Sequence, residues 1–219
     1  MSLRVVVYGE GSGDTGGETS QLPPPGSLLA ETHLGPAHEL LRRCIVRESS
    51  ISTEGVLFLC PLRLPSGRHA KGSALLDSRS LRQLLTWAVR ERRPDVAIVI
   101  VDQDGQRDRR ATLLSFTEGL SLPHVVAVPI QEFEAWLIAD HGAVVRALGQ
   151  SPNQPRSIET LDPREAKEQL AAWTAASAHA ADPKALRMTL ARTLDLALLD
   201  KLSAFKLFRQ DLHAAISSW

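Results

Sequence analysis

The sequence has few cysteines, few aromatic residues and no long apolar run. Among its 219 residues are two cysteines, and aromatic residues make up 5%. Cys44 and Cys60 have neither metal-site spacing nor a disulfide-framework pattern, so we expect reduced thiols in a cytoplasmic protein. No apolar run approaches the ~20 residues that cross a bilayer, and the first residues lack the features of a signal peptide. We therefore expect no membrane partner.

Several catalytic motifs are absent as well. The seven histidines show no paired zinc-binding spacing, no serine lies in a nucleophile elbow, and no Gly-Lys-Ser or Gly-Lys-Thr follows the early glycines. These absences argue against a zinc hydrolase, an α/β-hydrolase and a P-loop ATPase. Hydrophobic residues make up 43% of the chain, which is enough to form a core, so we expect a folded protein.

The formal net charge is zero, but the charges are unevenly spread. Residues 36–93 contain eleven Lys and Arg against five Asp and Glu, whereas residues 1–35 contain one against four. Residues 94–123 are acidic too, with three against five. The basic segment is compatible with a phosphate-facing surface, and equally with ordinary solvated helix faces.

Apolar runs predict four strands, at residues 3–8, 56–60, 95–101 and 125–130. Amphipathic stretches predict helices between and after them, at about 35–47, 78–92, 108–119 and from 132 onward. This alternation predicts an α/β fold with a doubly wound, mainly parallel four-stranded sheet. Residues 9–36 form a long loop rich in Gly, Ser, Thr and Pro, which is typical of a functional segment.

Strand patterns stop after residue 141. Helical stretches follow near 141–148, 163–175, 183–199 and 202–217. We therefore predict an α/β core over residues 1–141 and a C-terminal helical appendage over residues 142–219 that packs on it.

Acidic residues follow the first and third predicted strands. Glu10 and Asp14 come after the first, and Asp102 and Asp104 come after the third. In open α/β sheets chemistry gathers beyond the carboxyl ends of the strands, and oxygen ligands suit Mg²⁺. The pattern indicates a divalent-metal site, although Asp-x-Asp-Gly is also a common turn.

A third acidic group follows the fourth predicted strand. Glu132 and Glu134 lie where a helix begins, so they either complement the helix dipole or supply another metal ligand or general base. We favour Glu134 for the functional role. For phosphate binding the candidates are Arg68 and Lys71, in the polar loop of residues 65–72, and Lys206.

The residues quoted above resemble those of a known family. Glu10-Gly11 after the first strand and Asp102-Gln103-Asp104 after the third resemble the motifs of toprim domains. More closely, the whole chain resembles a bacterial domain family of unknown function, numbered 4276, which is related to the overcoming-lysogenization-defect nucleases. The segments that carry this likeness are Glu10-Gly11-Ser12-Gly13-Asp14, Asp102 to Asp104, Glu134 to Asp140, and Ser203 to Phe208.

The resemblance implies a toprim-like sheet, Mg²⁺ or Mn²⁺ as cofactor, and an ATPase partner encoded nearby in a phage or mobile-element defence system. The leading hypothesis is a metal-dependent nuclease acting on DNA or RNA, with metal bound by Glu10, Asp14, Asp102, Asp104 and Glu134. Two alternatives stay open. One is a haloacid-dehalogenase-like phosphatase, because Asp102-Gln103-Asp104-Gly105 mimics its nucleophile motif. The other is a non-catalytic toprim-like partner of an ATPase.

Overall fold

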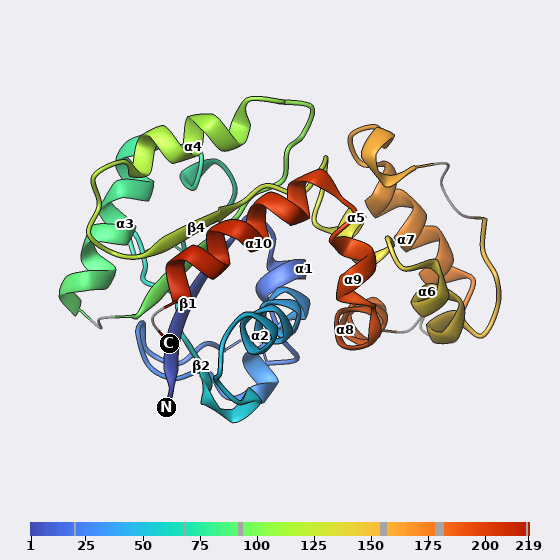
Figure 1. Ribbon diagram of the computed structural model, residues 1–219, viewed down its shortest axis with the longest axis horizontal. Helices are drawn as coiled ribbons and strands as arrows, with labels where there is room; N and C mark the ends of the chain where they lie inside the picture. Colours follow the sequence, from blue (N-terminus) through green and yellow to red (C-terminus); the bar gives the residue numbers. More distant parts are fainter. Residues whose placement is uncertain (20, 68, 92–93, 154–156, 178–181, 218) are drawn as a thin grey trace.

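The computed structural model describes residues 1–19, 21–67, 69–91, 94–153, 157–177, 182–217 and 219. Its centre is a sheet of four parallel strands in the order β2-β1-β3-β4 (Figure 1). The strands are β1 (Leu3–Gly9), β2 (Val56–Leu59), β3 (Val96–Ile100) and β4 (His124–Ala127). The predicted α/β class and parallel sheet are confirmed. The fourth strand ends three residues before its predicted end, at Ala127.

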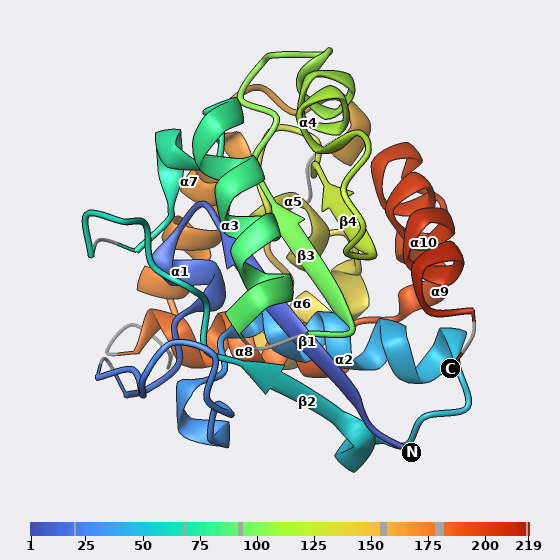
Figure 2. The same cartoon turned by 90° about the vertical axis from the view of Figure 1, so that its left-hand side faces the viewer.

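Helices cover both faces of the sheet, as a doubly wound fold requires. On one face lie α2 (Pro36–Glu48) and α10 (Ser203–Ile216), and on the other lie α3 (Ser78–Glu91) and α4 (Arg109–Thr117) (Figures 1 and 2). Proline at the first position of α2 suits a helix start, because its missing N–H would have no partner there.

The side chains of each buried strand pack into two separate cores, because successive side chains point to opposite faces of the sheet. Val5 and Val7 of β1 pack in the core beneath α2 and α10. Val6 and Tyr8 pack in the core beneath α3 and α4. A strand buried on both faces has no polar alternation, which explains the continuous apolar runs in the sequence.

Short helices fill much of the rest of the described chain. Several of them, including α6, α7 and α8, gather at one end of the molecule (Figure 1). The predicted helix at 183–199 is two helices, because Asp195 caps a new one by accepting a hydrogen bond from Ala197 N. Besides the four helices that cover the sheet, the described chain contains α1 (Ser12–Thr15), α5 (Glu134–Leu137), α6 (His141–Leu148), α7 (Glu165–Ala175), α8 (Pro183–Thr193), α9 (Leu196–Leu199), and the 3₁₀ turns η1 (Glu31–His33), η2 (Thr53–Gly55), η3 (Gly72–Ala74) and η4 (Ile158–Thr160).

The C-terminal helices share a core with the sheet. Trp136 of α5 is buried, and its ring centroid lies 5.0 Å from that of Phe205 and 5.5 Å from that of Phe208, both on α10. Leu186 and Leu190 of α8 belong to the same core as the sheet residues beneath α2. The division at residue 141 stays a prediction, but the two parts form one continuous apolar cluster.

The long segment after β1 is fixed along the outer strand β2. Leu29 N donates to Phe58 O at 2.8 Å, and Gly26 N donates to Cys60 O at 2.7 Å. Leu28 and Leu59 form an antiparallel bridge. This segment therefore covers the β2 edge of the sheet. Within the described residues, no helix combines the length and apolar character needed to span a bilayer.

Candidate functional site

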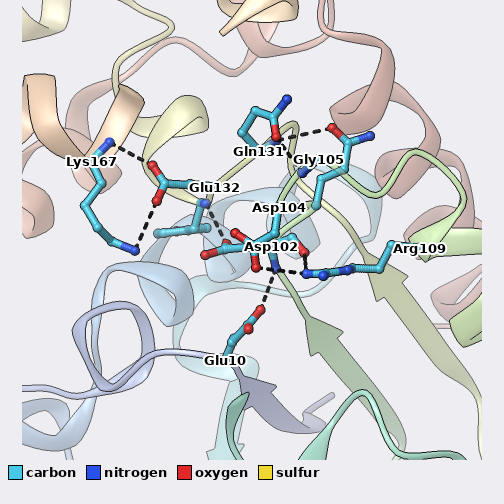
Figure 3. Close-up of polar contacts among 10 residues, drawn as sticks. Glu10, Asp102, Asp104, Gly105, Arg109, Gln131, Glu132 and Lys167 are labelled. Carbon is cyan, nitrogen blue, oxygen red and sulfur yellow. Dashed lines mark hydrogen bonds and ion pairs between the residues drawn. The ribbon is translucent and has the colours of Figure 1, made fainter. Parts of the chain in front are cut away.

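The carboxyl ends of β1 and β3 place two of the predicted acidic residues in contact. Gly9 pairs with Ile100 in the parallel register, so the chain leaves both strands at the same point. Directly beyond it, the backbone N–H of Asp102 donates to Glu10 Oε2 at 3.0 Å (Figure 3). The sequence-based expectation that Glu10 and Asp102 meet at one sheet edge is met by the structure.

Asp102 is held in place by the segment that follows β4. Its Oδ1 accepts a hydrogen bond from Phe133 N at 2.9 Å, and its side chain is buried. Burial raises the pKa of Asp102 to about 8, assisted by the nearby charges of Asp14, Glu134 and Glu10. The hydrogen bond from Phe133 acts in the opposite direction. Asp102 thus lies in a concentrated field of negative charge.

Asp14 and Glu134 complete this carboxylate cluster of Glu10, Asp14, Asp102 and Glu134. Asp14 lies on α1 and Glu134 opens α5, and both are buried. Burial raises the pKa of Asp14 to about 7, and the charge of Glu134 contributes next, while Arg187 counteracts both. Four carboxylates from three segments of the chain therefore interact in one largely buried region.

An arginine from the C-terminal helices lies inside the carboxylate cluster. Arg187 of α8 places Nη2 2.5 Å from Glu134 Oε1 and Nη1 3.7 Å from Asp14 Oδ1. A Cβ atom on Gly13 would come within 2.6 Å of Arg187 Nη1, so glycine at this position leaves room for the guanidinium. The guanidinium partly neutralises carboxylates that would otherwise repel one another.

Asp104 faces a different partner from Asp102. The backbone at Asp104 has φ 45°, and this left-handed turn directs its carboxylate to Arg109, whose Nη1 lies 3.1 Å from Asp104 Oδ2 (Figure 3). Arg109 also donates to the carbonyl oxygen of Asp102. The turn is fixed by Gln131, whose Oε1 accepts from Gly105 N at 2.8 Å. Asp104 is half exposed and lies at the rim of the cluster, so its role as a metal ligand stays a prediction.

The structure separates the two glutamates after β4. Glu132 turns to α7, where its Oε2 accepts from Lys167 N at 3.0 Å and its Oε1 lies 3.3 Å from Lys167 Nζ (Figure 3). It therefore caps the start of α7, whose first amides have no partner within the helix. Glu134 instead faces Asp14, Asp102 and Arg187. The carboxylate cluster therefore includes Glu134 and not Glu132, while a functional role for Glu134 stays a prediction.

The three predicted phosphate contacts have different surroundings. Arg68 lies outside the described residues. Lys71 is exposed and precedes Gly72, whose N–H donates to Glu10 O at 3.2 Å, so this segment runs beside the cluster. Lys206 lines a hollow with Glu48, Asp200 and Arg209 that contains none of the four carboxylates. Lys71 is the described candidate that the fold brings near the carboxylate cluster.

The donor set of the cluster suits a hard divalent cation. Its carboxylate oxygens are the ligands that Mg²⁺ and Mn²⁺ favour. Glu134 Oε2 is buried and has no hydrogen-bond partner within the described part of the chain, which leaves this oxygen available as a metal ligand. In the present arrangement, no three His, Cys, Asp or Glu side chains among the described residues form a ready-made metal site. Arg187 and, through weaker interactions, Lys167 supply positive charge to the cluster instead.

The chain matches no protein-family model, no curated protein and no solved structure. The sequence pattern did not indicate Arg187, Arg109 or Lys167, because each lies on a helix with no local feature that distinguishes it from other surface cations.

Proposed function

We propose that this protein is a toprim-like, metal-dependent nuclease that hydrolyses phosphodiester bonds in DNA or RNA. The observation that carries the proposal is the carboxylate cluster of Glu10, Asp14, Asp102 and Glu134 at the carboxyl edge of a parallel sheet. Concentrated carboxylates at that edge are costly to bury without a cation, and polynucleotide hydrolysis is a reaction for which such sites are used.

In this proposal Glu10, Asp14, Asp102 and Glu134 hold Mg²⁺ or Mn²⁺. Such an ion would supply polarisation of the phosphate and a more acidic water for the attack. Arg187 contacts both Asp14 and Glu134, so it would have to give up part of these contacts when an ion binds there. Backbone contacts keep Glu10 and Asp102 in register, and Phe133 N fixes one oxygen of Asp102. Asp104 and Arg109 shape the rim that the substrate approaches.

The likeness to the family numbered 4276 supports the same reading. Its Glu-Ala-Trp-Leu segment corresponds here to α5, which supplies both Glu134 to the cluster and Trp136 to the core. An ATPase partner and a place in a defence system are further parts of the proposal that derive from this resemblance alone.

The experiment is cleavage of labelled single-stranded and duplex DNA and RNA by the purified full chain, with Mg²⁺, Mn²⁺ or EDTA. We expect metal-stimulated cleavage that falls at least about a hundredfold in Asp102→Asn and Glu10→Gln. Glu118→Gln is the matched control, because Glu118 is exposed at the end of α4. The proposal fails if no metal stimulates cleavage, or if Asp102→Asn cleaves as fast as Glu118→Gln. The non-catalytic alternative predicts the first of these results.

A further inference from the structure

A cavity of about 350 Å³ lies beside the carboxylate cluster, between the end of β1, the segment that follows it and residues 61–71. This volume is at the small end of the range for ligand pockets, about 300–1,000 Å³. It accommodates one small ligand rather than a stretch of duplex. Its walls include backbone at Gly9 and Gly11, and a Cβ atom on Gly11 would come within 2.8 Å of Asp14 Oδ2. The cavity and the cluster therefore share a wall.

The lining of the cavity is basic, whereas the adjacent carboxylate cluster is acidic. Its described lining contains no Asp or Glu, but it contains Lys71, Lys184 and three histidines. Lys184 reaches from α8, where its Nζ donates to Gly17 O at 3.3 Å. Lys71 is exposed at the rim. Two ammonium groups without a carboxylate in the lining favour an anionic ligand.

His38 contributes a buried ring to the cavity wall. His38 Nδ1 accepts a hydrogen bond from Gly35 N at 3.1 Å, which places the ring proton on Nε2. His38 is almost fully buried, and its Nε2 has no hydrogen-bond partner among the described residues. The ring packs edge-on against Phe58, with the two ring centroids 4.9 Å apart, so the imidazole is a fixed part of the cavity wall.

The segment that follows β1, which forms one side of the cavity, is held by hydrogen bonds within itself. His33 accepts from Ala30 N through Nδ1 at 3.2 Å and bonds Gln21 O through Nε2 at 3.1 Å. Gly17 N donates to His33 O at 3.1 Å. Apolar side chains, including Leu22 and Leu29, line the same cavity and provide a surface on which a flat apolar group can rest. The cavity thus combines an apolar wall with cations at its rim.

We propose that this cavity binds a nucleoside monophosphate unit, as the terminal nucleotide of a strand or as a free nucleotide. The phosphate faces Lys71 and Lys184, and the nucleoside lies against the apolar wall. The inference rests on the proposed function for its substrate class. The cavity and the carboxylate cluster share a wall at Gly11. A terminal nucleotide bound in the cavity would therefore have its phosphodiester bond close to the cluster.

The test is titration of the full chain with AMP, adenosine and inorganic phosphate by calorimetry in EDTA, which removes any metal-mediated binding. We expect AMP to bind at least about tenfold more tightly than either adenosine or phosphate, because it uses both parts of the cavity. The double variant Lys71→Met, Lys184→Met should bind AMP at least about tenfold more weakly. Lys201→Met, an exposed lysine outside the cavity lining, is the matched control.

The two sources of the nucleotide are distinguished by a second titration. A short oligonucleotide with a 5′-phosphate, compared with the same strand without it, should show a tenfold preference if the cavity takes strand ends. Equal binding, with AMP still bound, assigns the cavity to free nucleotides. The inference is overturned if AMP does not bind, if phosphate binds as tightly as AMP, or if the double variant binds like Lys201→Met. Loss of cleavage in Asp102→Asn with AMP binding intact separates this inference from the proposed function.

Discussion

Replacing Arg187 by methionine tests whether its guanidinium offsets the charge of the carboxylate cluster. The substitution keeps most of the apolar stem but leaves Glu134 and Asp14 buried without their contact to Nη2 and Nη1. Removing one partner of a buried ion pair costs ~3–5 kcal/mol. Because the Arg187 side chain is 19% exposed, we expect the lower end, about 3 kcal/mol of unfolding free energy.

The assay is urea denaturation of the full chain at pH 7.5 in EDTA. Arg192→Met is the matched control, because Arg192 lies on the exposed side of the same helix. Adding Glu134→Gln to Arg187→Met should recover part of the loss, since the neutral amide no longer needs a cation. In a parallel series without EDTA, Mn²⁺ should stabilise Arg187→Met more than the parent chain. The reasoning is refuted if Arg187→Met and Arg192→Met unfold at the same urea concentration.

Three further predictions follow from described contacts. Asp14 and Asp102 hold their protons to about pH 7 and 8 when folded but release them near pH 4 when unfolded, so the folded state binds more protons between these limits. Stability in EDTA should therefore fall as pH rises from 5 to 8, and in denaturant titrations Asp102→Asn should flatten this fall; a rise would contradict it. Glu132→Ala removes the acceptor that caps α7 and should cost about 1–2 kcal/mol, with faster hydrogen exchange at Lys167 N; unchanged exchange would rule out the cap. Trp136→Ala should cost about 3–5 kcal/mol in thermal unfolding, because the ring packs against both Phe205 and Phe208; a loss under 1 kcal/mol would be inconsistent with that packing.

The strands were predictable because their pattern is local. A run such as Val96 to Ile100 has no polar face, and such a run is typical of a strand buried on both sides. The meeting of Glu10 and Asp102 also followed from topology, since neighbouring parallel strands end at the same edge. The class of fold and the place of the candidate site could therefore be predicted from the sequence.

The finer arrangement of the site depends on contacts between distant segments. The difference between Glu132 and Glu134 is set by Lys167 and Arg187, which lie more than thirty residues further along the chain. Asp104 diverges from Asp102 because of a left-handed turn that no strand pattern encodes. The cavity depends on how the segment after β1 lies along β2, and no periodicity in that loop predicts its path.

The position of Arg187 on α8 has a consequence for dividing this protein. A chain cut at residue 141 would lose the cation that offsets Asp14 and Glu134, and also the apolar cover that Phe205 and Phe208 give to Trp136. The sheet would be left with an exposed apolar face and an acidic edge without a counter-ion, two features that promote aggregation and unfolding. For expression the whole chain is therefore the appropriate unit, because the C-terminal helices supply both a counter-ion to the acidic edge and part of the core of the sheet.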